Sequence, residues 1–234
     1  MVNAQHEDSV GSAGDDADVF GTDDGTRVKI CGITNAADAR SCVAAGADML
    51  GFNFYRKSPR YIDPERAREI ISSLPETVLS VGVFVNEPSP AAVAAIADQA
   101  SLGALQLHGE ESPEFCDALL RWPVIKAFRV GPGFDPSVIT PYHTPAILLD
   151  GFAIQTHGGT GRAFDWRVAE GLTDRVERVF LAGGLGVNNV AEAIRQVRPF
   201  AVDACSRLEL RPGIKDPTLV ASFVEAVRSV KVNA

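Results

Sequence analysis

The chain has 234 residues, of which 46% are hydrophobic and 22% are charged, and its formal net charge is −8. This is the composition of an ordinary globular protein, so a collagen, a coiled coil or a largely disordered chain is excluded for its main part. The length suits one domain, since a single α/β barrel commonly occupies about 200–250 residues.

The negative charge is concentrated at the N-terminus. Residues 1–26 contain seven acidic residues and neither Lys nor Arg. Such a segment cannot bury enough apolar surface to offset its chain entropy, so we predict a disordered acidic tail over 1–26 and one domain over 27–234. Because the rest of the chain has no excess of basic residues, we expect no nucleic-acid partner.

The sequence gives no sign of membrane insertion or export. No apolar run approaches the roughly 18–20 residues of a membrane helix, and the N-terminus has neither the basic nor the apolar part of a signal peptide. We therefore expect a cytoplasmic protein without a membrane partner. The four cysteines lack C-x-x-C spacing and nearby histidines, so we expect free thiols and no metal site; they are Cys31, Cys42, Cys116 and Cys205.

Short apolar runs alternate with amphipathic segments eight times from Val28 onward. The predicted strands are residues 28–31, 48–54, 79–85, 104–107, 124–129, 146–150, 178–182 and 200–203. The predicted helices lie near 35–45, 64–73, 89–99, 112–121, 187–197 and 216–230, with weaker patterns near 135–140 and 165–170. Strands this short and this apolar are typical of a parallel sheet that is covered on both faces. Eight units predict an α/β fold, the single-domain (β/α)8 TIM barrel, with a six-stranded doubly wound sheet as the alternative.

Three of the predicted helices have a recognisable start. Each begins with a capping side chain followed by a proline, at Ser89-Pro90, Ser112-Pro113 and Asp216-Pro217. A proline fits the first helical turn because its missing N–H would have no partner there. The helices are therefore expected to follow the strands directly.

The unusual residues fall at the ends of the predicted strands, where the chemistry of a (β/α)8 barrel gathers. They are Cys31, Arg60, His108, Asp150, Asp203 and Ser206. Glycine-rich loops follow the sixth strand (158–161, GGTG) and the seventh (183–186, GGLG). Because glycine lets backbone N–H groups approach an anion closely, these loops predict a phosphate site and a phosphorylated substrate. The alternative is that the glycines only form tight turns.

The segment 184–189 (GLGVNN) also resembles a dinucleotide-binding fingerprint. Asn189 replaces the third glycine, however, and the segment follows the seventh strand, whereas a dinucleotide fold carries its fingerprint after the first. We therefore expect no nucleotide cofactor.

Cys31 and Asp150 are the candidates for a base and an acid. They end the first and sixth predicted strands, on opposite sides of the ring, where they could act on two ends of one substrate. A thiol acts as a base only when it is ionised, and an aspartate acts as an acid only when it holds a proton. The alternatives are a small core residue at Cys31 and a loop cap at Asp150.

Eight segments of the chain resemble the motifs of one protein family. They are VKICGIT (28–34), GADMLGFNFYRKSPRYI (46–62), VGVFVNE (81–87), LQLHGEE (105–111), IKAFRV (125–130), GGTGRAFDW (158–166), LAGGLGVNNV (181–190) and VDACSRLELRPGIKD (202–216). In this order and at these strand ends they resemble the phosphoribosylanthranilate isomerase family of tryptophan biosynthesis, from about residue 28 to the C-terminus.

The resemblance implies a cofactor-free barrel that converts N-(5′-phosphoribosyl)anthranilate to 1-(2-carboxyphenylamino)-1-deoxyribulose 5-phosphate, an Amadori rearrangement. It implies that Asp150 protonates the ribose ring oxygen and that Cys31 removes the C2′ proton. Arg60 would bind the anthranilate carboxylate, and His108 and Asp203 would line the site. The phosphate would be held by Gly159, Gly161, Gly183, Gly184 and Ser206. The expected partner is this small-molecule phosphosugar, and the expected assembly is a monomer or a homodimer.

One departure and two alternatives remain open. The family usually reads Asp-Val-Ser-Ser-Gly after the last strand, where this chain has DACSR over 203–207. Loss of the glycine at 207 could alter the turn that presents backbone donors to phosphate, although Arg207 would add a cation. The alternatives are another phosphosugar barrel, such as a ribulose-phosphate epimerase or an isomerase that also serves the histidine pathway, and a non-catalytic phosphate-binding barrel. Cys31 argues against the histidine-pathway enzyme, and the presence of both Cys31 and Asp150 argues against an inactive barrel.

Overall fold

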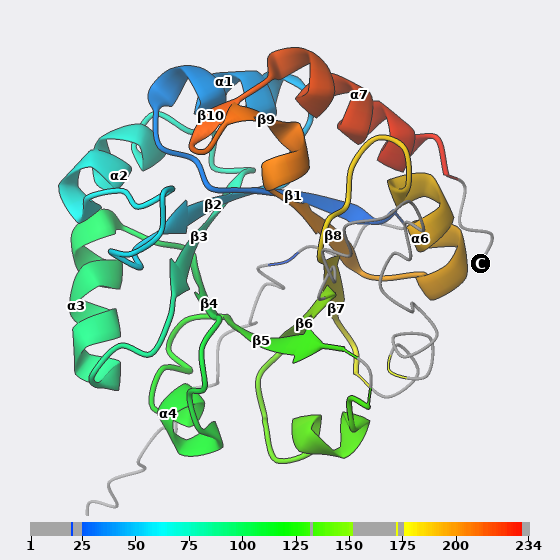
Figure 1. The fold of residues 1–234 in the computed structure, drawn as a ribbon. Helices are drawn as coiled ribbons and strands as arrows, with labels where there is room; N and C mark the ends of the chain where they lie inside the picture. The colour runs from blue at the N-terminus through cyan, green and yellow to red at the C-terminus, as the bar shows by residue number, and fades with distance from the viewer. Residues whose placement is uncertain (1–19, 21–24, 132, 152–171, 173–175, 231–234) are drawn as a thin grey trace, which may run out of the picture.

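The computed structural model describes residues 20, 25–131, 133–151, 172 and 176–230. Within them, eight parallel strands close into a barrel in chain order, and helices surround it (Figure 1). The strands are β1 (Arg27–Cys31), β2 (Met49–Asn53), β3 (Leu79–Phe84), β4 (Ala104–Leu107), β5 (Val124–Val130), β6 (Ala146–Gly151), β7 (Val179–Ala182) and β8 (Ala201–Ala204). The helices are α1 (Ala36–Ala44), α2 (Pro64–Ile71), α3 (Pro90–Ala100), α4 (Pro113–Asp117), α6 (Val190–Val197) and α7 (Pro217–Arg228). The (β/α)8 prediction is confirmed, and the six-stranded alternative is wrong.

The barrel closes where β8 pairs with β1. Ile30 lies opposite Ala204 in this parallel pair, so the ends of the two strands are neighbours although they are far apart in the sequence. Side chains alternate along each strand. The even-numbered residues at these ends pack toward the helices, which leaves Cys31 on the inner face.

The predicted helix caps are confirmed. The Ser89 hydroxyl accepts a hydrogen bond from the N–H of Ala92 at 3.2 Å, and Asp216 accepts from the N–H groups of Thr218 and Leu219. Ser112 caps α4 in the same way. These caps start each helix shortly after its strand and so keep the connecting loops short.

The secondary structure differs from the predictions in three places. The helix expected over 112–121 ends at Asp117, where the backbone tightens into turns with i→i−3 hydrogen bonds, such as Leu119 N–H to Cys116 O and Trp122 N–H to Leu119 O, both at 3.0 Å. The weak pattern near 135–140 is a single 3-10 turn, η1 (Pro136–Ile139), and the helix predicted near 165–170 lies outside the described residues. A hairpin that was not predicted, β9 (Glu209–Arg211) with β10 (Ile214–Lys215), follows the 3-10 turn η2 (Ser206–Leu208). None of the helices in the described ranges is long and apolar enough to cross a membrane.

Apolar side chains fill both sides of the barrel wall. The larger cluster lies between the sheet and the helices. The smaller one fills the barrel interior and includes Met49, Val81, Ile125, Leu148 and Phe180. Because both faces of the sheet are covered in this way, the strands read as continuous apolar runs.

Phe20 belongs to the interior cluster. It is 6% exposed, and its ring centroid lies 5.8 Å from that of Phe180 and 6.2 Å from that of Phe200, both edge-on. Thr26, at the end of the predicted tail, is also buried, and its backbone oxygen accepts from Arg228 at 3.0 Å. Residues 1–19 and 21–24 lie outside the described part of the chain, so for them the tail stays a prediction. For Phe20 the expectation of a solvated residue is wrong, because its ring packs against the rings of Phe180 and Phe200.

Candidate active site

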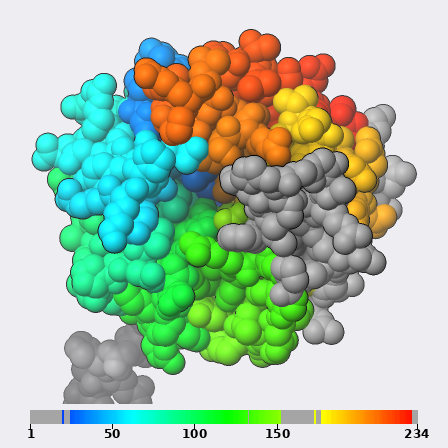
Figure 2. All heavy atoms as spheres, in the orientation of Figure 1, coloured from blue at the N-terminus to red at the C-terminus, as the bar shows by residue number. Residues whose placement is uncertain are grey.

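A cavity of about 290 Å³ opens at the carboxyl ends of the barrel strands. Eight of the predicted site residues line it, namely Cys31, Arg60, His108, Asp150, Gly183, Gly184, Asp203 and Ser206. The space-filling view shows the surface hollowed near the centre of the barrel (Figure 2). Gly159 and Gly161 lie outside the described residues. The barrel therefore brings the candidate acid and the candidate base to one cavity.

Asp150 is held by a short chain of hydrogen bonds that starts on β4. The amide Nε2 of Gln106 lies 2.7 Å from Nδ1 of His108 and donates to it. With Nδ1 of His108 accepting from Gln106, Nε2 is the ring nitrogen that donates to Oδ2 of the Asp150 carboxyl group, at 3.1 Å. His108 and Asp150 are both partly exposed to the cavity. The chain fixes one oxygen of Asp150 and leaves the carboxyl group accessible to a bound molecule.

Cys31 lies in surroundings that favour its thiolate. The pKa of Cys31 is well below its usual value, chiefly because of its side-chain interaction with Cys205. Burial acts in the opposite direction, and the charges of Lys29 and Lys215, with a smaller contribution from His108, also favour the anion. The proton of the Cys205 thiol is donated to Oε1 of Glu209 at 3.9 Å. A thiol in such an electropositive and partly open place is a reactive one.

Lys29 and Asp203 form an ion pair at the floor of the cavity. Their charged atoms lie 3.0 Å apart, and both residues are buried. Burial raises the pKa of Asp203 to about 7, although Lys29 opposes the rise. Burial lowers the pKa of Lys29, but Asp203 outweighs it and the net change is upward. The floor therefore keeps its cation, and the pKa of its carboxyl group lies above the usual range.

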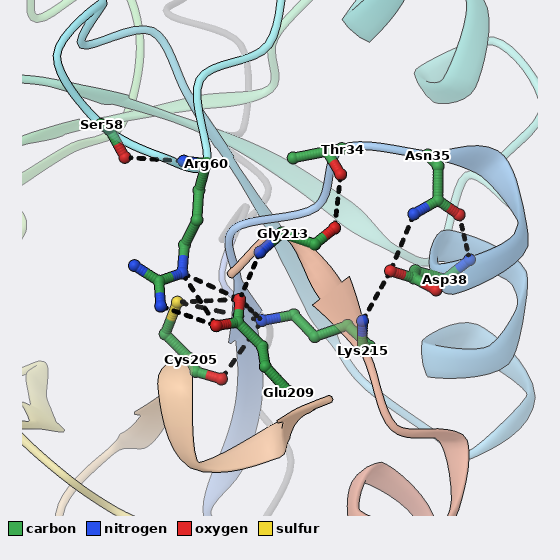
Figure 3. Close-up of polar contacts among 9 residues, drawn as sticks. All are labelled: Thr34, Asn35, Asp38, Ser58, Arg60, Cys205, Glu209, Gly213 and Lys215. Carbon is green, nitrogen blue, oxygen red and sulfur yellow. Dashed lines mark hydrogen bonds and ion pairs between the residues drawn. The ribbon is translucent and has the colours of Figure 1, made fainter. Parts of the chain in front are cut away.

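Arg60 is bound by a carboxylate that the sequence analysis did not single out. Its Nε and Nη2 donate to Glu209 over 2.6–3.1 Å (Figure 3). Lys215 Nζ donates to Glu209 at 3.1 Å and to the backbone oxygen of Cys205 at 3.2 Å. Burial raises the pKa of Glu209, but Arg60 and Lys215 more than offset it, so that pKa lies below its usual value. The hairpin β9–β10 thus fixes Arg60 beside the cavity.

Glycine is required at one position of the late loops. Gly183 has φ +93°, and a Cβ there would lie 2.3 Å from the backbone nitrogen of Gly151. The loop after β7 therefore contacts the end of β6 directly. Arg207, which stands where the family has glycine, lies in η2 and is not one of the described residues with positive φ. The turn consequently does not need glycine at that position.

Asn189 explains why the fingerprint-like segment 184–189 does not follow the nucleotide-binding pattern. Its Oδ1 accepts from the N–H of Gly186 at 2.8 Å, and its Nδ2 donates to the oxygen of Gly184 at 3.1 Å. The side chain thus occupies backbone groups of the loop that a dinucleotide phosphate would approach.

Several residues of the site were missed by the sequence analysis. Gln106 and Lys29 follow the inward alternation of β4 and β1, so the strand pattern could have pointed to them. Glu209 and Lys215 lie on a hairpin with no strong sequence signal. Among the described residues, no group of three or more His, Cys, Asp or Glu side chains is arranged to hold a metal ion.

The fold and the cavity at its carboxyl-terminal end define a (β/α)8-barrel enzyme. Residues 28–226 match the model of the N-(5′-phosphoribosyl)anthranilate isomerase family. The isomerase of Trichlorobacter lovleyi is 48% identical over 198 residues, which cover 85% of this chain and 96% of that protein. The chain belongs to the N-(5′-phosphoribosyl)anthranilate isomerase family.

Solved structures agree with this assignment. One shows monomers generated from the dimeric isomerase of Thermotoga maritima. Its sequence is 43% identical to this chain and its TM-score is 0.78. The match covers 87% of this chain and 99% of that one. Another shows a phosphoribosylanthranilate isomerase with reduced 1-(o-carboxyphenylamino)-1-deoxyribulose 5-phosphate; it is 44% identical, has a TM-score of 0.78, and the match covers 87% and 98% of the two chains. The identities are high enough for the family to be shared as well as the fold.

Proposed function

We propose that this chain converts N-(5′-phosphoribosyl)anthranilate to 1-(2-carboxyphenylamino)-1-deoxyribulose 5-phosphate, with Asp150 as the acid and Cys31 as the base. The observation that supports these roles most is that the two side chains line one cavity from β6 and β1. Opposite placement suits a reaction in which one atom of the sugar gains a proton and another loses one.

Asp150 acts first. Its carboxyl proton passes to the ribose ring oxygen, the bond from C1′ to that oxygen breaks, and the open chain becomes a Schiff base of the anthranilate nitrogen. The hydrogen bond from His108 to Oδ2 of Asp150 orients the carboxyl group for this transfer. His108 is thus a positioning residue, and Gln106 fixes which of its ring nitrogens carries the proton.

Cys31 acts second. Its thiolate removes the proton from C2′, and the electron pair moves into the C1′–C2′ bond to give an enolamine. Tautomerisation then places a proton on C1′ and removes the proton of the C2′ hydroxyl, which yields the ketone. Lys29 and Lys215 keep the thiolate stable until the substrate is in place.

Two anionic ends of the substrate require fixed partners. The guanidinium of Arg60 has five N–H donors, and Glu209 takes those of one edge, so we assign the other edge to the anthranilate carboxylate. We assign the phosphate to the backbone N–H groups near Gly183, Gly184 and Ser206, with Gly159 and Gly161 completing that site. The exposed Arg207 adds a cation beside Gly186.

The reaction moves only protons, so we propose no cofactor and no metal for it. The assembly that we propose is a monomer or a homodimer. We further propose that the chain works in the cytoplasm as an enzyme of tryptophan biosynthesis.

The test follows the fluorescence of the anthranilate ring after the protein meets freshly generated phosphoribosylanthranilate. We expect rapid decay with the wild type and a loss of about 10²–10⁴-fold in kcat for Asp150→Asn, which keeps the shape of the side chain but has no acidic proton. Asp98→Asn, an exposed carboxylate on α3, is the matched control and should decay like the wild type. Decay of Asp150→Asn at the wild-type rate would contradict the role of Asp150.

A further inference from the structure

The base Cys31 has a second thiol as its direct neighbour. Cys31 ends β1, and Cys205 directly follows β8, whose last residue Ala204 pairs with Ile30. The two cysteine side chains interact with each other. Adjacent strands lie about 4.8 Å apart. A disulfide needs Cα atoms roughly 4.4–6.8 Å apart, a separation that residues at the ends of two paired strands can reach.

Both sulfurs face the cavity. Cys31 is 9% exposed and Cys205 is half-buried, and each lines the same space of about 290 Å³. A Cβ placed on Gly32 would lie 3.0 Å from Sγ of Cys205, which puts that sulfur directly against the end of β1. A small molecule that enters the cavity can therefore reach the pair.

The charges around the pair favour the anionic form of sulfur. Lys215 Nζ lies 3.8 Å from Sγ of Cys205, and Lys29 is buried on the Cys31 side. The interaction between the two side chains lowers the pKa of Cys31 and raises that of Cys205, so Cys31 is the thiolate and Cys205 the thiol, whose proton is donated to Oε1 of Glu209 at 3.9 Å. An accessible thiolate beside a second thiol is the arrangement of oxidant-sensitive cysteines.

The other two cysteines provide an internal contrast. Cys42 on α1 and Cys116 on α4 are fully buried among apolar residues. Burial raises the pKa of Cys42 to about 12 and that of Cys116 to about 11. Both stay protonated and out of reach, so they should remain reduced when the pair reacts.

We propose that Cys31 and Cys205 are a reversible oxidation site, which hydrogen peroxide converts to a disulfide that removes the base. The Cys31 thiolate attacks one peroxide oxygen, the O–O bond breaks, and hydroxide leaves and takes up a proton as water, so that Cys31 becomes a sulfenic acid. The sulfur of Cys205 then attacks that of Cys31, the S–S bond forms, the S–O bond breaks, and the second oxygen leaves as water with the Cys205 proton. Two thiols and one peroxide thus give one disulfide and two waters.

The first step prepares the second. Cys205 is kept protonated chiefly by the anionic Cys31. When Cys31 becomes a neutral sulfenic acid that charge is gone, whereas Lys215 remains at 3.8 Å and favours the Cys205 thiolate. Oxidation of Cys31 therefore removes the partner that most opposes ionisation of the Cys205 thiol, while the Glu209 carboxylate at 3.9 Å continues to oppose it. The disulfide then protects Cys31 from irreversible oxidation.

The experiment treats the full chain with hydrogen peroxide, measures isomerase turnover before and after dithiothreitol, and maps linked peptides by mass spectrometry. We expect turnover to be lost, the peptides of Cys31 and Cys205 to be joined with loss of two hydrogens, and dithiothreitol to restore turnover. In Cys205→Ser, scored against its own starting rate, the loss should persist after dithiothreitol, because Cys31 proceeds to the sulfinic acid. Cys116→Ala is the matched control and should recover like the wild type.

The oxidation site rests on the proposed function in one respect only: turnover is lost because Cys31 is the base. The linked peptides do not depend on that role. Absence of the linked peptides, or full recovery of Cys205→Ser, overturns the oxidation site. Linked peptides with undiminished turnover confirm the oxidation site and contradict Cys31 as the base.

Discussion

The two ends of the barrel interior are built from the same strands and have opposite characters. At the amino-terminal end the inward side chains are apolar, and Phe180 and Phe200 meet the ring of Phe20. At the carboxyl-terminal end the inward positions carry Lys29, Asp203 and the thiol pair. Inward residues at the start of the strands therefore stabilise the fold, and inward residues at their ends form the active site. The residues for stability and for activity thus lie only a few positions apart on the same strands.

The largest effect on stability is expected at the apolar end. Phe180→Ala should lower the free energy of unfolding by about 3–5 kcal/mol, because Phe180 is fully buried and leaves a cavity. Phe20→Ala should lower the free energy of unfolding by less, since it affects one residue outside the barrel strands. If the two rings interact directly, the loss in the double variant should be smaller than the sum of the two single losses by about 0.5–1.5 kcal/mol. Urea unfolding of the four proteins gives these numbers.

The same cycle tests the division between the ends. The rate of the folded Phe20→Ala protein should equal that of the wild type, because Phe20 lies at the end of the barrel away from the cavity. If the two losses in free energy of unfolding are strictly additive, Phe20 does not pack against Phe180 in solution. If the turnover of Phe20→Ala falls below that of the wild type, the two ends of the barrel are coupled.

A smaller effect is expected at the polar end, in the ionisation of Cys31. The pKa of Cys31 is lowered, so its reaction with iodoacetamide should persist as pH falls and decline only when pH passes below that lowered value. In Cys205→Ala the side-chain interaction that lowers the pKa of Cys31 most is gone, and the decline should begin at a higher pH. Cys205→Ser supplies a hydroxyl donor and should restore much of the wild-type profile. Identical profiles for wild type and Cys205→Ala would mean that the lysines alone set the ionisation.

The sequence revealed most of the architecture and part of the site. The eight strands and the helix starts at Ser89, Ser112 and Asp216 were predictable, because the apolar runs and the capping residues are local signals. The hairpin β9–β10 was not, because its two short strands are held through contacts with distant segments, Glu209 with Arg60 and the backbone N–H of Lys215 with Asp38. Phe20 was missed because the acidic composition around it hides a single buried ring.

The thiol pair shows the same limit more clearly. Cys31 stood out from its place at the end of a strand, whereas Cys205 gained its importance only from the register between β1 and β8. That register depends on the closure of the whole barrel, which no local pattern encodes. The motifs therefore identified the family, and the structure revealed the neighbour of the base.

The most direct test of the account is the turnover of Cys31→Ala, measured by loss of anthranilate fluorescence beside its urea unfolding curve. We expect kcat to fall by about 10²–10⁴-fold while KM and the free energy of unfolding stay close to those of the wild type, because the thiolate acts on the C2′ proton and not in binding or folding. Turnover within about tenfold of the wild type, roughly 1.4 kcal/mol in the barrier, would contradict Cys31 as the base.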